Sequence, residues 1–168
     1  MRAILIIMLA AISQFVHAES IFLVPGENWG FQFNSPKLVQ QKGNASATEF
    51  QFEASTEIGF IISGFVEPAS GKGNSSKECM SYYWALSSKN PSILKDTVKV
   101  IAAEPFAVVT YLIEAEYQGK RYIQPNANYY GYRNNTCVDF HVSQTFLYDS
   151  KIDYSNLIGF GKSFGYYK

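Results

Sequence analysis

The sequence lacks an excess of either charge, because 14 lysine and arginine residues balance 14 aspartate and glutamate residues. No basic patch stands out, which argues against nucleic acid as a partner and against a membrane surface that holds the protein by charge. Two glycine-rich pieces, residues 71–74 and 159–162, lack the spacing of a phosphate-binding loop. Histidine occurs twice, as His17 and His141, which is too few for a metal site. We therefore expect no cofactor and no metal.

Long apolar runs are also scarce, and the one that stands out spans residues 3–12. It follows the basic Arg2 and precedes Val16-His17-Ala18, which suits a cleavage site. This order is typical of a secretory signal peptide, and the run is shorter than the roughly 20 residues that span a bilayer. The alternative is a core segment of a cytosolic protein. We predict a signal peptide at 1–18 and one exported domain at 19–168, periplasmic or secreted and without a membrane span.

Cysteine is limited to Cys79 and Cys137, and neither belongs to a Cys-x-x-Cys pair. In an oxidising compartment an even pair most simply forms one disulfide. Such a bond would stabilise the fold by roughly 2–4 kcal/mol, mainly through the unfolded state. The alternative is two unpaired buried thiols.

The hydrophobic pattern predicts several strands, a helix, a run of hairpin-connected strands and a closing helix. Ser75 or Ser76 can cap the first helix, which must end before Asn90-Pro91. Gln118-Gly119 and Asn134-Asn135 are predicted turns. The predicted strands are 29–33, 50–52, 58–66, 98–101, 106–117, 120–123, 129–133 and 136–146, and the helices start near 75 and at 153, the latter ending at 163. Hairpins imply a mainly antiparallel sheet with helices packed on it, an α+β domain.

This layout resembles the PsbP-like family of small exported proteins. The resemblance rests on Trp29-Gly30-Phe31 with Phe33 and Pro36, on Tyr82-Tyr83-Trp84, on the Gln118-Gly119 hairpin, on the strand 137–145 and on the closing segment 157–164. The two cysteines and the tyrosines at 129–132 depart from the family pattern. The resemblance implies an α/β/α sandwich and a binding or assembly role, and it implies no shared catalytic residues.

Asp139, His141 and Ser143 alternate along the last long strand and so share one face. These residue types make up nucleophile, base and orienting group in hydrolases. However, residues i and i+2 of a strand lie about 6.5–7 Å apart, too far for an easy hydrogen-bond relay. The alternative is a polar face that is solvated or covered by a helix.

Tyr129, Tyr130, Tyr132 and Arg133 form a second candidate group, flanked by several asparagines. Tyrosine and arginine are enriched where proteins bind partners. The alternative is an aromatic strand that packs internally.

Three functions remain open from the sequence. The first is a non-enzymatic exported module that binds or assembles with a protein, an envelope component or a small ligand. The second is a small hydrolase that uses His141 with Asp139 or Ser143. The third is a carrier of an apolar small ligand held between sheet and helix.

Overall fold

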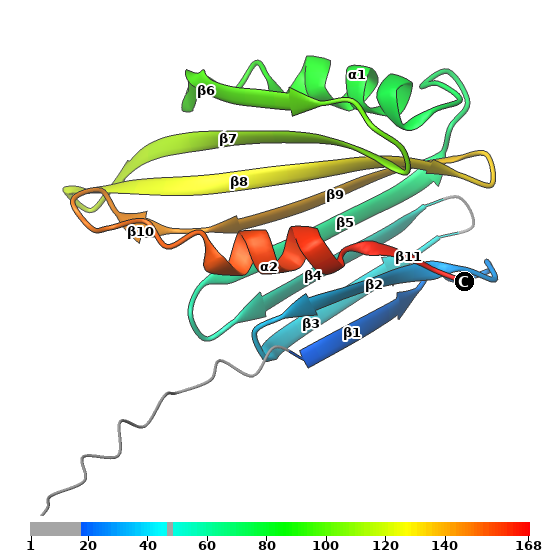
Figure 1. Ribbon diagram of the computed structural model, residues 1–168, viewed down its shortest axis with the longest axis horizontal. Coiled ribbons are helices and arrows are strands. Elements are labelled where there is room, and N and C mark those ends of the chain that lie inside the picture. Colours follow the sequence, from blue (N-terminus) through cyan, green and yellow to red (C-terminus); the bar gives the residue numbers. More distant parts are fainter. Residues whose placement is uncertain (1–17, 47–48) are drawn as a thin grey trace, which may run out of the picture.

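The structure is a computed structural model that describes residues 18–46 and 49–168. The predicted signal peptide lies outside the described residues except for Ala18, which begins the first strand. The described part contains, in chain order (Figure 1), β1 Ala18–Leu23, β2 Gly30–Ser35, β3 Leu38–Ala45, β4 Phe50–Thr56, β5 Phe60–Pro68, α1 Ser76–Ser87, β6 Ile93–Ile101, β7 Phe106–Tyr117, β8 Lys120–Arg133, β9 Thr136–Gln144, β10 Phe146–Leu147, α2 Ser155–Ser163 and β11 Gly165–Tyr167. None of the helices in this part is long and apolar enough to cross a membrane.

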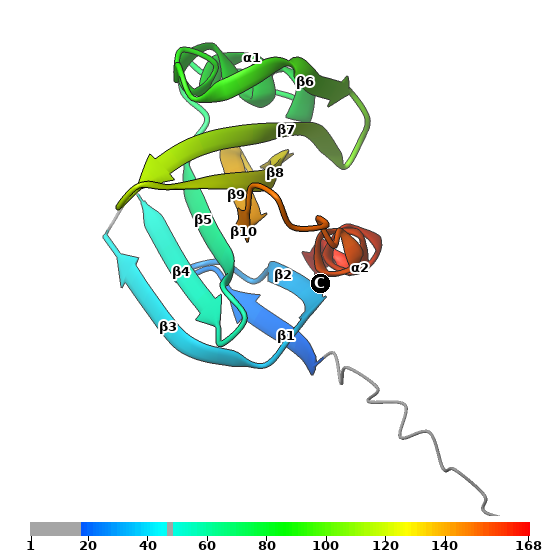
Figure 2. The ribbon, with the colours of Figure 1, turned by 90° about the vertical axis from the view of Figure 1, so that its left-hand side faces the viewer.

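One large antiparallel sheet organises the molecule. Its strands follow the order β3-β4-β5-β9-β8-β7-β6, and β10 pairs with β8 beside β9. A smaller antiparallel sheet has the order β1-β2-β11. Figure 2 shows that the large sheet curls, with β1, β2 and α2 on its inner face and α1 on its outer face.

Two tight turns set the register of the central strands. Gln118 and Gly119 have φ values of 50° and 71°, and Asn134 and Asn135 have 48° and 59°. Two consecutive residues with positive φ are typical of type I′ hairpins, which match the twist of the flanking strands. Both predicted turns are therefore confirmed. They align β7 with β8 and β8 with β9 without a break in register.

The inner face carries an aromatic core. Trp29, which directly precedes β2, and the alternating β2 residues Phe31 and Phe33 are 0–1% exposed. The ring centroid of Phe31 lies 5.1 Å from that of Phe140 on β9, and the ring of Phe33 lies 4.9 Å from Phe160 on α2. Buried side chains of this size stabilise a fold by roughly 1.5–3 kcal/mol each, so these rings fix β2 and α2 against the large sheet.

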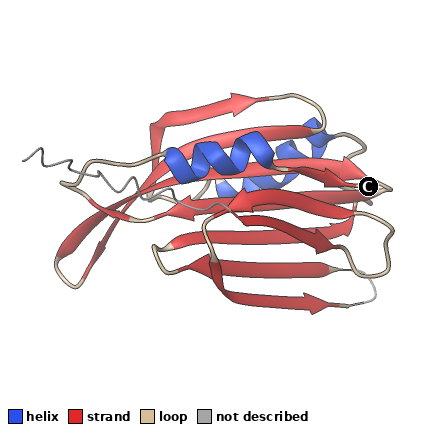
Figure 3. Cartoon of the chain, turned by 60° about the horizontal axis from the view of Figure 1, so that its bottom comes forward, coloured by secondary structure: helices blue, strands red, loops and turns tan. Residues whose placement is uncertain are grey.

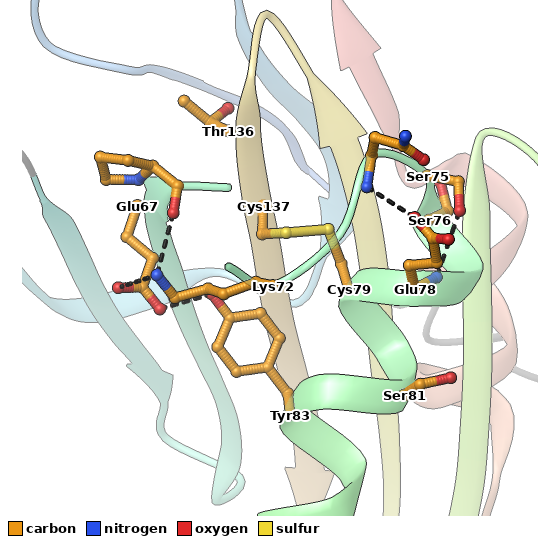
Figure 4. The surroundings of a disulfide bond; sticks show 12 residues. Glu67, Lys72, Ser75, Ser76, Glu78, Cys79, Ser81, Tyr83, Thr136 and Cys137 are labelled. Atoms are coloured by element: carbon orange, nitrogen blue, oxygen red, sulfur yellow. Dashed lines mark hydrogen bonds and ion pairs between the residues drawn. A yellow bond between two sulfur atoms is a disulfide. The ribbon is translucent and has the colours of Figure 1, made fainter. Parts of the chain in front are cut away.

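The outer face carries a second core, beneath α1. Ser75 caps this helix by accepting a hydrogen bond from the backbone N–H of Glu78 (3.3 Å), as the sequence predicts. Cys79 and Cys137 form a disulfide between α1 and β9, with their Cα atoms 5.7 Å apart (Figure 4). One turn further along, the Tyr83 hydroxyl donates to Glu67 (2.6 Å). The predicted disulfide is confirmed, and no described cysteine is free.

The predicted α+β class with its α/β/α sandwich is wrong, because the described part is a β-rich, mainly antiparallel fold with two short helices. Strands dominate the molecule (Figure 3), and the inner face is covered by the three-stranded sheet β1-β2-β11 together with one short helix rather than by a helical layer. The sandwich was implied by the family resemblance, and the prediction of one main sheet did not foresee that the strand 29–33 belongs to a second, smaller sheet. The alternation of this strand is real, but its aromatic residues pack across the inner face instead of extending the main sheet.

Several strands differ from the prediction: β1, β3 and β11 were not predicted, and β4, β5, β6, β8 and β9 have other bounds. For β3, β8 and β9 the difference has a physical reason. β3 escaped prediction because it is a polar, exposed edge strand that lacks a buried face. β8 is one strand and not two, because Pro125 lies where the neighbour of β8 changes from β9 to β10, a position that needs no N–H donor. For the same reason the last long strand ends at Gln144 and resumes as β10.

Candidate functional site

The polar face of β9 lies on the outer side of the sheet, as the alternation predicts. The register places Asp139 beside Tyr130, His141 beside Asn128, and Ser143 beside Asn126. Asp139 and His141 are half-buried, whereas Ser143 is buried. Part of this face is covered by α1, and the remainder is open.

His141 is held by two hydrogen bonds. The Asn126 amide nitrogen donates to the Gln124 carbonyl (2.6 Å), so the Asn126 oxygen is the atom that accepts from His141 Nε2 (2.8 Å). His141 Nδ1 then accepts from the Ser63 hydroxyl on β5 (3.5 Å). Burial lowers the pKa of His141 to about 4. The ring is therefore neutral at physiological pH, with its proton on Nε2.

Asp139 belongs to a second relay on the same face. The Asn128 amide donates to Asp139 Oδ1 (2.9 Å), and the Tyr111 hydroxyl donates to the Asn128 oxygen (3.0 Å). Burial raises the pKa of Asp139 to about 6, which the hydrogen bond from Asn128 partly offsets. The same burial, with the nearby carboxylate, raises the pKa of Tyr111 to about 12.

The three candidate catalytic residues do not act on one another. Ser143 accepts from the Gln124 side chain (3.3 Å), while His141 pairs with Asn126 and Ser63, and Asp139 pairs with Asn128. The hydroxyl group that hydrogen bonds to His141 is that of Ser63, not that of Ser143.

This arrangement is poorly suited to nucleophilic catalysis. A histidine with a pKa near 4 is a weak general base at neutral pH. Ser63 lies in β5, which is paired on both sides, so backbone N–H groups around it donate to β4 and β9 and cannot stabilise an oxyanion. In the described part of the chain, no group of three or more His, Cys, Asp or Glu residues could hold a metal ion.

The tyrosines of the second candidate group point to opposite faces. Tyr130 is 0% exposed and lies under α1, with its ring stacked on Tyr83 at 6.1 Å. Tyr129 is buried on the inner face, 5.5 Å from the Phe160 ring. Arg133 lies over the Tyr166 ring at 5.0 Å. With the half-buried Tyr132, these side chains do not form one continuous surface.

An apolar groove of about 650 Å³ opens on the inner face between α2 and strands β6, β7 and β8. Its floor is formed by the β7 residues that face the inner side, Val108, Thr110 and Leu112, and one wall is formed by the side of α2 that carries Ile158. Apolar side chains provide most of the lining, chiefly Ile101, Val108, Leu112, Ala127, Leu157 and Ile158. Ile101 is 60% exposed and Ile158 53%, so both rims of the groove carry apolar surface in contact with solvent.

One charged side chain lines this groove. Lys99 pairs with Thr110 and Ile101 with Val108, and paired residues of neighbouring strands project to the same face. The ammonium of Lys99 therefore lies on the groove side of β6, near the polar groups of Thr97 and Thr110. The groove thus has an apolar body and a basic edge.

The groove was missed in the sequence, although a signal was present. Residues 108, 110 and 112 of β7 are Val, Thr and Leu, while the alternate residues 107, 109, 111 and 113 are Ala, Val, Tyr and Ile. A strand with apolar residues on both faces is covered on both sides. Ser63 was missed because it interrupts an apolar run, where it reads as a tolerated small residue.

Comparison with known proteins adds little. No protein-family model and no curated protein matches the chain. A crystal structure of a protein from Bacteroides thetaiotaomicron is similar over 82% of this chain and 45% of that one, at 11% sequence identity and a TM-score of 0.45. This chain spans less than half the length of that protein, and a likeness at this level carries no argument about function.

Proposed function

We propose that this protein is an exported, non-enzymatic binding module that carries a small amphipathic ligand in the groove between α2 and β6–β8. The observation that carries the proposal is the groove itself, with about 650 Å³ of mostly apolar lining and a few polar groups at one edge. Small-molecule sites typically have this size and composition. A buried disulfide, which persists in oxidising compartments, supports export.

The lining also favours one kind of occupant. Lys99 is the charged residue at the edge, and within the described part of the chain no acidic side chain contributes to the lining. A ligand with an apolar chain and an anionic head group satisfies both parts of the site. We therefore expect a single acyl chain with a carboxylate or similar head, its chain along β7 and its head at Lys99.

Oleate is a suitable probe of this site. The mature chain, residues 19–168 with its disulfide formed, should bind oleate in titration calorimetry and should release a bound naphthalene-sulfonate dye as oleate is added. Ile158→Glu places a charge on the apolar rim, and we expect at least a tenfold weaker affinity. Ile61→Glu, a matched change of an exposed isoleucine on the outer face, should bind like the wild type.

The head-group contact has its own test. Lys99→Met should weaken oleate binding several-fold and remove most of its dependence on salt, because one charge-assisted contact is lost. Lys120→Met, on the distant hairpin, should change neither. No oleate binding by the wild type, or equal loss in Ile61→Glu and Ile158→Glu, would contradict the proposal.

A further inference from the structure

A second hollow, of about 530 Å³, lies on the outer face over β3, β4, β5 and β9. From its geometry we propose that it binds a neutral saccharide, which lies on the Phe65 ring and hydrogen bonds to the polar side chains around it. This site is on the opposite face of the sheet from the apolar groove, so the inference goes beyond the proposed function and does not depend on it.

The register of four strands arranges the side chains of this hollow in two rows. Lys42 is paired with Glu53, Glu53 with Ser63, and Ser63 with His141. Two residues along, Asn44 is paired with Gln51, Gln51 with Phe65, and Phe65 with Asp139. Neighbouring strands lie about 4.8 Å apart and the rows about 6.5–7 Å apart, so the eight side chains form a regular grid with one aromatic ring inside it.

The floor of the grid is fixed in place. His141 is held between Ser63 and Asn126, and Asp139 accepts a hydrogen bond from Asn128 through Oδ1. Polar groups that are already oriented by neighbours lose little entropy when a ligand binds. Asp139 lines the hollow, and within the described residues its second oxygen accepts no hydrogen bond.

The rim of the grid has unused hydrogen-bonding capacity. Lys42, Asn44, Gln51 and Glu53 are exposed, and among the described residues their side chains take part in no hydrogen bond or ion pair. Together they offer ammonium and amide donors beside carboxylate and amide acceptors. A sugar hydroxyl is both a donor and an acceptor, so adjacent hydroxyls can satisfy such a mixed set.

The aromatic ring and the charge balance narrow the ligand class. Phe65 is half-buried between Gln51 and Asp139 and offers an apolar platform for the C–H face of a sugar ring. Lys42 opposes Glu53 directly across the strands and His141 is neutral, so among the described lining residues only Asp139 adds an unbalanced charge, a single negative one. A strongly cationic, anionic or wholly apolar ligand would leave several of these polar groups unpaired, which costs free energy.

Neutral disaccharides test this inference. Cellobiose, maltose and N,N′-diacetylchitobiose would each be titrated at millimolar concentration into the ¹⁵N-labelled mature chain. We expect at least one of them to shift the amide resonances of β4, β5 and β9 in a saturable way, while those of α2 and β6 stay unchanged. Saturable shifts confined to other elements, or no shifts with all three sugars, would overturn the proposal.

Variants at Phe65 and Gln51 separate binding from folding. Phe65→Leu should weaken saccharide binding about tenfold, and Phe65→Tyr should retain it. Gln51→Ala changes an exposed side chain and should weaken binding several-fold with an unchanged spectrum elsewhere, while the matched Gln118→Ala should have no effect. Wild-type affinity in Gln51→Ala and Phe65→Leu would overturn the assignment even if a sugar binds.

Discussion

At the scale of single residues, the pKa values of His141 and Asp139 are shifted in opposite directions by the same cause, which is burial on one polar face. Both are half-buried on the outer side of β9, two residues apart. Burial disfavours the charged form of each, so the pKa of His141 falls to about 4 and that of Asp139 rises to about 6. Near pH 5, both side chains are therefore mainly uncharged in the folded protein.

These two shifts act on stability in opposite directions. His141 has a lower pKa in the folded than in the unfolded chain, so its contribution is lost as pH falls from about 6.5 towards 4. Asp139 has a higher pKa in the folded chain, so its contribution is lost as pH rises from about 3.8 through about 6. In the wild type the two slopes largely cancel between pH 4 and 6.

Replacing one residue should expose the slope of the other. We expect Asp139→Asn to lose more stability than the wild type when pH is lowered from 7 to 4.5, and His141→Gln to lose less. The two variants should diverge by about 4 kcal/mol over this range, because one pKa unit corresponds to about 1.4 kcal/mol and the two opposite slopes add when the variants are compared. Urea unfolding at each pH measures this difference. Parallel pH profiles for both variants would contradict it, and Asp149→Asn, an exposed carboxylate, serves as the control.

At the scale of elements, α1 is attached to the sheet by one covalent bond and one small core. The disulfide joins its first turn to the start of β9, and Cys79 and Cys137 are both 0% exposed. Trp84 packs 5.1 Å from Tyr111 on β7 and extends this core along the helix. The helix therefore covers only part of the outer face and leaves the polar hollow open beside it.

Removing the disulfide should loosen α1 before the rest of the fold. The bond closes a loop with a sequence separation of 58 residues, so the Cys79→Ala, Cys137→Ala double variant should lose about 2–4 kcal/mol of unfolding free energy. Urea titration measures the loss, and hydrogen exchange should show the amides of α1 opening first. The single variant Ser75→Ala, which removes only the helix cap, should cost about 1 kcal/mol. A double variant as stable as the wild type would contradict a constraining role.

Elements were predictable from sequence where a local rule sets them. The two type I′ turns, the cap at Ser75 and the span of β7 follow from turn chemistry, capping and alternation. The placement of β2 was not predictable in this way. Its alternation of buried and half-buried residues is the same for a strand within the large sheet and for one that packs across it. Only long-range aromatic contacts decide between the two placements.

In the candidate sites, too, the features set by local sequence were predictable and those set by long-range contacts were not. Alternation correctly placed Asp139, His141 and Ser143 on one face, but their partners Asn126, Asn128 and Ser63 lie on other strands and depend on register. Adjacent tyrosines in a strand point to opposite faces, which is why Tyr129 and Tyr130 belong to two cores. The apolar groove needs α2 to pack on β2 and β9, and these long-range contacts are not encoded by any local pattern.

At the scale of the whole molecule, one sheet separates two cores that serve different surfaces. The inner core joins β2 and α2 to the sheet and supports the apolar groove, while the outer core joins α1 and borders the polar hollow. The central strands β8 and β9 contribute to both. Phe160 is the main link of α2 to the inner core, with its ring 4.9 Å from Phe33, 5.1 Å from Phe164 and 5.5 Å from Tyr129.

Phe160→Ala should therefore disturb the inner face of the molecule and leave the outer face intact. The ring is fully buried, so its loss should cost about 3–5 kcal/mol and should release α2 from the sheet. Oleate binding should be lost, because α2 forms one wall of the groove, while saccharide binding and the disulfide should persist on the outer face. Hydrogen exchange should speed up in α2 and β2 but not in β8 and β9.

Phe146→Ala, at the edge of the sheet, is the matched control for this prediction. Leu157→Ala offers a milder release of α2 if Phe160→Ala does not fold. Equal loss of both binding activities in a folded Phe160 or Leu157 variant would show that the two faces are coupled and not independent.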